Sequence, residues 1–146
     1  WAKPLILTGP PAVAAAGGRP VQPGDAGLLR TGEEAFTMDD PQFYIQPGMS
    51  AESTLHLTAM GATILGTDAV GWDLPFRLMN AKWQERGDKR RLWDGHKAIT
   101  QREAFIVQQL CNLAALPPTG FHVGFFPIKL AGCSAAPSRV VAFVPD

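Results

Sequence analysis

The sequence lacks an excess of charge of either sign. Lys and Arg together number 13, and so do Asp and Glu, which gives a formal net charge of zero at pH 7. Proteins that bind nucleic acids usually carry a basic surface, whereas charged residues make up only 18% of this chain. We therefore expect one globular domain over residues 1–146 that does not bind nucleic acid.

Long apolar runs and a cysteine framework are also missing. No stretch reaches the roughly 18 apolar residues that a membrane span requires. The first residues show no charged-then-apolar leader of a secreted protein. The two cysteines, Cys111 and Cys133, form no recognisable metal or disulfide pattern. These absences predict a cytoplasmic protein without membrane association, in which both cysteines are partly buried thiols.

What the sequence does contain is an alternation of strand and helix patterns. Short apolar runs bounded by turn residues predict strands at residues 4–9, 26–30, 62–65, 121–126, 128–130 and 139–144. Residues 10–16 predict one or two helical turns. Ser50 is a typical N-cap for a helix to about Met60, and apolar spacing predicts a second helix over residues 99–113. Residues 31–47 and 72–93 are predicted to be irregular connections. This order predicts an α/β fold with a mixed sheet.

Few residues point to chemistry by themselves. The three histidines, at 56, 96 and 122, lack the close spacing of a metal-binding helix or loop. Neither a nucleophile elbow nor a phosphate-binding glycine motif is present. Asp68 follows a predicted strand, where ligands of α/β folds collect, so it either orients a site residue or shapes a turn. Trp72, four residues later, either anchors a loop or faces a substrate.

Gln108 lies on a polar stripe of the predicted helix over residues 99–113. Such a stripe is usually a solvated face. A Gln carbonyl oxygen can instead bind a hard cation such as Mn²⁺, and the imidazole of His96 is a nitrogen donor. On residue types alone both interpretations stay open.

Six segments, in order along the chain, resemble the cyclase family of metal-dependent hydrolases, the group that includes kynurenine formamidase and isatin hydrolase. The segments are QPGDAGLLRTG (22–32), QPGMS (46–50), ILGTDAVGWDLPF (64–76), GHKA (95–98), NLAALPPTGF (112–121), and FPIKL with APSRVVA (126–142). One such segment would be a weak signal, but six in register make the resemblance specific.

This resemblance implies a swivelling β/β/α fold and a divalent metal, manganese or zinc. It implies that a metal-activated water hydrolyses an amide, lactam or formamide C–N bond of a small-molecule substrate. The family places a metal ligand twelve residues after the histidine of the GHK segment, which makes Gln108 a ligand through its carbonyl oxygen. His96 is the second candidate ligand, serving a second metal or contacting substrate. Trp72 and Asp68 are the candidate substrate-binding residues.

The principal metal motif of the family, His-x-Gly-Thr-His-x-Asp, is absent from this sequence, and so is the histidine that serves as catalytic base. We therefore expect no catalytic residue within this chain. It is predicted to be the carboxy-terminal part of a cyclase-family domain, completed by an upstream part of the same polypeptide or a companion chain, in a homodimer or homotetramer. Two alternatives stay open: a cyclase or dehydratase acting on a biosynthetic intermediate, and a non-catalytic binding member of the same fold.

Overall fold

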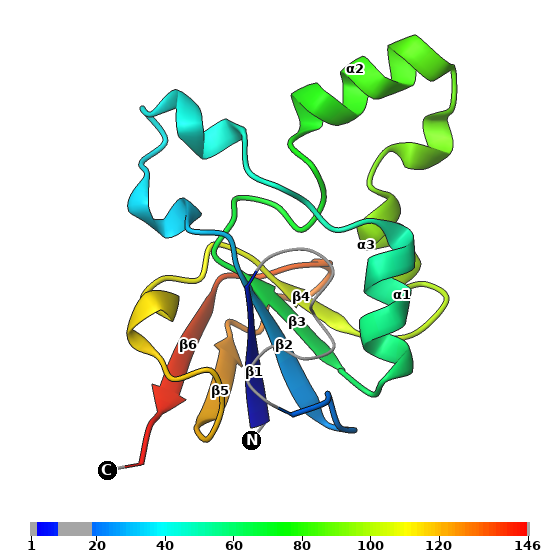
Figure 1. Ribbon diagram of the computed structural model, residues 1–146. Coiled ribbons are helices and arrows are strands. Elements are labelled where there is room, and N and C mark those ends of the chain that lie inside the picture. Colours follow the sequence, from blue (N-terminus) through cyan, green and yellow to red (C-terminus); the bar gives the residue numbers. More distant parts are fainter. Residues whose placement is uncertain (1–2, 9–18, 146) are drawn as a thin grey trace.

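The computed structural model describes residues 3–8 and 19–145 (Figure 1). Its strands are β1 (Lys3–Thr8), β2 (Asp25–Arg30), β3 (Ile64–Thr67), β4 (Phe105–Val107), β5 (His122–Pro127) and β6 (Ser138–Phe143). The α-helices are α1 (Ala51–Ala59), α2 (Phe76–Arg86) and α3 (Asp94–Ala98). Short 3-10 helices lie at Glu33–Ala35, Pro41–Tyr44, Lys89–Arg91 and Leu113–Ala115.

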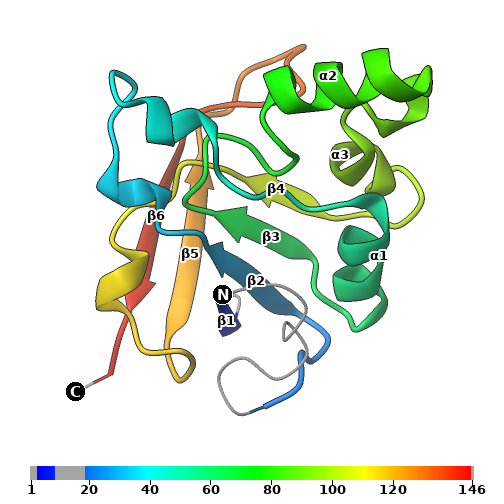
Figure 2. The ribbon, with the colours of Figure 1, turned by 45° about the horizontal axis from the view of Figure 1, so that its top comes forward.

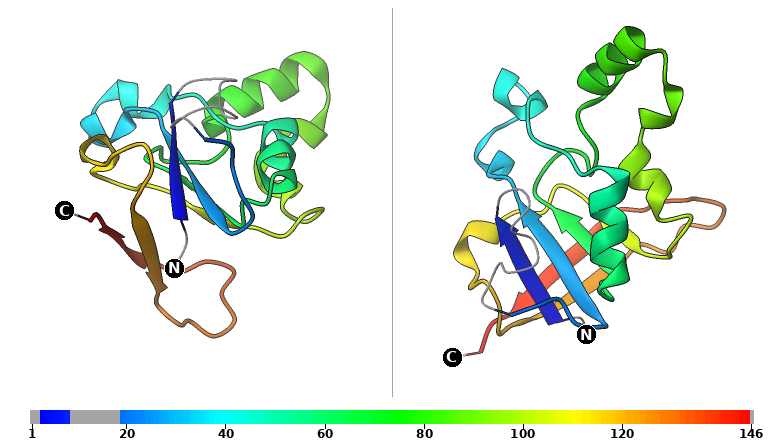
Figure 3. Two further views of the ribbon diagram at one scale, coloured as in Figure 1. Left: turned by 60° about the horizontal axis from the view of Figure 1, so that its bottom comes forward. Right: turned by 45° about the vertical axis from the view of Figure 1, so that its right-hand side comes forward.

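The strands form two sheets. Strands β1 to β4 lie side by side in a parallel sheet in that order, and β5 pairs with β6 in an antiparallel hairpin. Side chains alternate along β2, so Leu29 packs with Leu57 of α1 on one face, while Leu28 packs with Val123 of β5 on the other. The layers are therefore hairpin, parallel sheet and helices, as the two views of Figure 3 show. The α/β fold of β/β/α type is confirmed, with its parallel and antiparallel strands assigned to separate sheets.

The helix predicted from Ser50 is confirmed. The Ser50 hydroxyl accepts a hydrogen bond from the Ser53 N–H at 3.2 Å, which satisfies one donor of the first turn of α1. The chain leaves the helix at Gly61, whose φ of 102° lies in the region that favours glycine. The predicted strands at 26–30, 121–126 and 139–144 agree with β2, β5 and β6 within one residue, and the strand predicted at 62–65 begins two residues later, as β3.

The helix predicted over residues 99–113 is wrong. Residues 105–107 form β4, which pairs with β3 from Ile64 to Gly66. Further on, Gln109 and Asn112 take φ values of 57° and 63°, which no α-helix accommodates. The β-branched residues Ile106 and Val107 suit a strand, and pairing with β3 outweighs the helical spacing of the apolar residues. The strand predicted at 128–130 is also absent.

The connection predicted over residues 72–93 is wrong as well, because it contains α2. This helix follows Pro75 and ends at Gly87, whose φ of 67° is that of a left-handed cap. Met79 is its only buried residue, so the segment carries no apolar stripe that would reveal a helix. Figure 1 shows α2 standing away from the parallel sheet, with α3 between α2 and the body of the fold.

Three further expectations concern the remainder of the chain. The helical turns predicted at 10–16 lie outside the described residues. Cys111 and Cys133 are both free, as expected, but they are exposed and not partly buried. Among the residues that the structure describes, no helix is long and apolar enough to cross a membrane.

Candidate functional site

The candidate site lies beyond the carboxyl ends of β3 and β4. Because the sheet is parallel, these ends meet at one edge, toward which the arrowheads of β2, β3 and β4 point in Figure 2. Asp73 lies in the segment that follows β3, His96 lies in α3, and Gln108 directly follows β4. The edge at which α/β folds usually bind ligands therefore carries a carboxylate, an imidazole and an amide.

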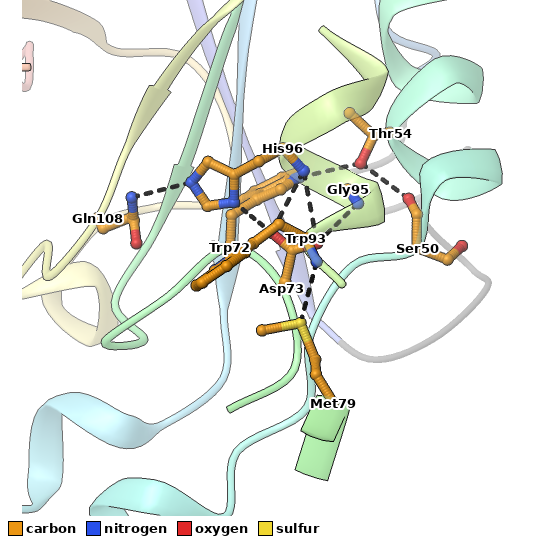
Figure 4. A network of polar contacts seen from close by, with 9 residues as sticks. All are labelled: Ser50, Thr54, Trp72, Asp73, Met79, Trp93, Gly95, His96 and Gln108. Carbon is orange, nitrogen blue, oxygen red and sulfur yellow. Dashed lines mark hydrogen bonds and ion pairs between the residues drawn. The ribbon is translucent and has the colours of Figure 1, made fainter. Parts of the chain in front are cut away.

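Asp73 is the buried anchor of the site, at 3% exposure. Its carboxylate accepts hydrogen bonds from the Gly95 N–H at 2.6 Å and the His96 N–H at 3.2 Å, and a third from Nδ1 of His96 (Figure 4). Two of these donors are free N–H groups of the first turn of α3, where a negative charge is favourable. Asp73 thus holds both the start of α3 and the ring of His96.

The close contact between Asp73 and the start of α3 requires glycine at position 95. A Cβ on Gly95 would lie 2.5 Å from the carbonyl oxygen of Met49 and 2.9 Å from Oδ1 of Asp73. Those distances are well below van der Waals contact, so a larger residue would push α3 away from Asp73. The GHK segment therefore has a packing reason for its glycine.

His96 and Gln108, the two predicted metal ligands, are brought together. The hydrogen bond of Nδ1 to Asp73 places the imidazole proton on Nδ1, so Nε2 carries a lone pair. The Gln108 amide lies 3.3 Å from this Nε2 and donates to it (Figure 4). The His96 side chain is 34% exposed, and Gln108 is exposed. Both groups are therefore accessible to a ligand.

The pair fits a divalent cation only in part. Donor atoms bound to one ion at about 2.1 Å lie roughly 3.0–3.4 Å apart, and the two side-chain groups already lie 3.3 Å apart. One cation could accept both if the Gln108 amide turned to present Oε1. A closed protein site for such ions uses about four ligands. Over residues 3–8 and 19–145, no group of three or more His, Cys, Asp or Glu side chains could hold a metal. The described residues thus bring together two possible donors, His96 and Gln108, which is fewer than a closed metal site requires.

A cavity of about 200 Å³ adjoins these donors. Its polar lining comes from Asp73, His96 and Gln108, and the rest is mainly apolar, including Phe76 and Trp93. A larger open groove of about 1050 Å³ also reaches His96 and Gln108, from the side of β4 and the hairpin. The donors therefore lie where a small cavity and a long apolar groove meet.

Trp72 and Asp68, the predicted substrate-binding residues, occupy other places. Trp72 is 1% exposed, and its indole N–H donates to the Thr54 hydroxyl at 2.9 Å. Asp68 is 3% exposed and accepts from the N–H and hydroxyl of Thr31 and from the Gly32 N–H. These contacts favour the structural interpretations, a Trp that anchors a loop and an Asp that fastens a turn. Substrate binding by either residue stays a prediction.

Sequence reasoning missed the buried carboxylate of Glu33. It is 3% exposed, its Oε1 accepts the Val70 N–H at 2.8 Å, and its Oε2 is buried without a partner. Burial raises the pKa of Glu33 to about 6, against the Val70 hydrogen bond, which lowers it, while the nearby charge of Asp68 raises it further. Position 33 looks like a polar loop in the sequence, and no local pattern signals this burial.

We expect Glu33 to make stability depend on pH. In the unfolded chain its pKa is near 4.5, so between pH 4.5 and about 6 the folded protein binds more protons. Its contribution is therefore fully present below pH 4.5 and is lost as the pH rises through 6, by about 1–2 kcal/mol. Glu33→Gln keeps the acceptor for Val70 and should remove this loss. Urea unfolding of wild type and Glu33→Gln at pH 4.5 and 7 measures this loss. If the two proteins differed in unfolding free energy by the same amount at both pH values, the prediction would be contradicted.

Comparisons with known proteins show what this chain resembles. Residues 11–74 match the model of the family Cyclase, described as "Putative cyclase". No curated protein sequence matches significantly. An isatin hydrolase bound to the product analogue thioisatinate is similar, with a TM-score of 0.75 and 18% identity over 99% of this chain and 60% of that one.

Two further solved structures have the same fold. Isatin hydrolase A from Ralstonia solanacearum has a TM-score of 0.74 and 23% identity over 97% of this chain and 54% of that one. A structure described as a potential metal-dependent hydrolase with cyclase activity has a TM-score of 0.61 and 22% identity, over 86% and 54% respectively. The chain thus spans between about half and three-fifths of the length of these relatives. The family model over residues 11–74 and the shared fold agree with the resemblance of the six segments to the cyclase family.

Proposed function

We propose that this chain forms part of a metal-dependent hydrolase that cleaves an amide, lactam or formamide C–N bond of a small molecule. The observation that carries the proposal is the hydrogen-bonded series Asp73–His96–Gln108 at the ligand-binding edge of the sheet. The similar structures support it, since they are described as isatin hydrolases and a potential metal-dependent hydrolase.

The residues of this chain have defined roles in that reaction. Gln108 and His96 would hold a divalent cation, manganese or zinc, which when bound polarises a carbonyl and activates water. Asp73 positions His96 and fixes its proton on Nδ1, so that Nε2 faces the ligand. The Gln108 amide can donate to a substrate oxygen when it does not donate to His96. Leu74, Pro75 and Phe76 line the apolar part of the cavity beside these groups.

The experiment that tests the proposal is a calorimetric titration of Mn²⁺ and Zn²⁺ into wild type, Gln108→Ala and Gln108→Glu. Gln108→Ala should weaken metal binding by about ten- to a hundredfold and reduce turnover, because one donor is lost. Its thermal stability without metal should change little, since the side chain is exposed and packs little. Gln108→Glu should keep or raise affinity, because a carboxylate is the stronger ligand for a hard cation.

Gln101→Ala provides the matched control, because Gln101 is also exposed and lines neither the cavity nor the groove. Its affinity for both ions should equal that of wild type. If Gln108→Ala binds both ions as tightly as wild type does, Gln108 is not a ligand.

A cyclase or dehydratase is the second candidate, favoured by the relative described as having cyclase activity. The same groups would then promote loss of water from a substrate instead of its addition. Product mass distinguishes the two, since the products of hydrolysis sum to the mass of the substrate plus about 18 mass units, whereas dehydration gives a product about 18 mass units lighter. A non-catalytic binding role would leave the substrate unchanged.

We further propose that the remaining ligands and the catalytic base come from an upstream part of the same polypeptide or from a companion chain. The two-donor set of His96 and Gln108 supports this, as does the share of the similar structures that the chain spans. A homodimer or homotetramer in the cytoplasm is proposed on the family resemblance. Sedimentation of the native protein measures its assembly.

A further inference from the structure

Two exposed aromatic side chains flank the cavity beside His96. The rings of Phe76 and Trp93 are stacked, with centroids 5.4 Å apart and planes inclined by 25°. Phe76 is 56% exposed and Trp93 47% exposed. Both line the cavity that also contains His96 and Gln108. Large apolar surface left open beside polar groups is typical of a ligand-binding wall.

The backbone of Trp93 holds this wall in place. Its φ of 52° and ψ of 41° lie in the left-handed region, which is unfavourable for a bulky residue and is found mostly where surrounding contacts impose it. The Trp93 N–H donates to the sulfur of buried Met79 in α2 at 3.2 Å (Figure 4). The next residue begins α3, in which Asp73 holds His96. The backbone of Trp93 is therefore held between α2 and the helix that carries His96.

We propose that Phe76 and Trp93 are specificity-determining residues, which bind the flat ring of a cyclic amide and direct its carbonyl toward His96 and Gln108. This rests on the proposed hydrolase function for the reaction that follows binding. A cavity of about 200 Å³ is small, which favours a ligand of one or two fused rings. A planar apolar ring can stack on the exposed aromatic surface, while the Gln108 amide donates to the carbonyl oxygen.

Two cyclic imides test this role, phthalimide and succinimide. They share the same polar group, and only phthalimide carries a benzene ring. Binding of each to the 146-residue chain is measured by calorimetry in EDTA, so that no metal-dependent turnover occurs. Wild type should bind phthalimide about tenfold more tightly than succinimide. Phe76→Ala and Trp93→Ala should each reduce this ratio by about two- to tenfold through weaker phthalimide binding alone.

Tyr44→Ala is the matched control, because Tyr44 is 51% exposed and lines neither the cavity nor the groove. Its binding ratio should equal that of wild type. Circular dichroism checks that each variant is folded. If Trp93→Ala does not fold, the binding ratio of Phe76→Ala alone tests the proposal. Three results would overturn the proposal: no imide binding by wild type, an unchanged ratio in the folded variants, or an equal loss for both imides. Absent hydrolysis would contradict only the proposed function, because ring preference is measured without metal.

Discussion

Gly48→Ala should destabilise the fold by about 3 kcal/mol or more. A Cβ at this position would lie 2.0 Å from the backbone nitrogen of Leu74 and 2.1 Å from the carbonyl carbon of Asp73. These are main-chain atoms, so no side-chain rotation relieves the overlap. Nearby, the Met49 N–H donates to the Trp72 carbonyl at 2.7 Å, a bond that separation of the two segments would break. Urea unfolding followed by tryptophan fluorescence measures the loss.

Gly71→Ala is the matched control for this variant. Gly71 lies in the segment that faces Gly48, two residues before Asp73. Its backbone does not adopt a positive φ, and a Cβ there would meet no atom closer than 3.6 Å. Its unfolding free energy should stay within about 0.5 kcal/mol of wild type. If Gly48→Ala proved as stable as Gly71→Ala, the backbone of Gly48 would not lie in close contact with residues 73 and 74, and the prediction would be contradicted.

Asp73→Ala should be comparably severe and should also disorganise the site. It leaves the Gly95 and His96 N–H groups without their acceptor, and the loss of buried acceptors costs about 1–3 kcal/mol each. We expect a total of about 3 kcal/mol, together with faster hydrogen exchange of the Gly95 amide. Asp73→Asn keeps one oxygen acceptor and should lie between wild type and Asp73→Ala in both measurements.

The His96 ring supplies a readout that stability alone does not give. Without Asp73 its Nδ1 loses its partner, so the proton is no longer fixed there, and nitrogen chemical shifts of the imidazole should report a mixture of tautomers. Asp88→Ala is the control, since this carboxylate lies between Asp73 and His96 in the sequence and pairs with exposed Arg90. It should leave the His96 spectrum unchanged. A single Nδ1–H tautomer in Asp73→Ala would show that Asp73 does not position the ring.

The parts of the fold that sequence patterns predict are those with a local cause. Buried aliphatic residues at positions 26, 28 and 29 mark β2, and Ser50 marks the start of α1. Helix α2 has no such cause, because Met79 is its only buried residue, although Pro75 and Gly87 at its ends were usable signals. The prediction for residues 99–113 is wrong for the opposite reason. Its apolar spacing fits a helix, and pairing with β3 overrides that spacing.

In the candidate site, too, some features could be predicted from the sequence and others depend on the folded chain. His96 and Gln108 can be singled out by residue type and resemblance, and they lie in contact. Their mutual placement, however, depends on β4 instead of the predicted helix. Asp73 could not be assigned its role, because its partners lie 22 and 23 residues away and only the folded chain brings them together. Burial of Glu33 depends likewise on Val70, 37 residues further along the chain.

The hydrogen bonds of Asp73 have a consequence for how this chain can accommodate changes in length. Residues 74–94 leave the body of the fold at Asp73 and return at Gly95, and the 2.6 Å bond between these two residues ties both ends of the excursion together. Closing a flexible loop costs only about 0.6 kcal/mol more for each doubling of its length. The excursion can therefore be lengthened, shortened or grafted from a relative while the tie keeps His96 in register with Gln108. Sequence changes in residues 74–94, which include Phe76 and Trp93, are thereby separated from the contact between His96 and Gln108.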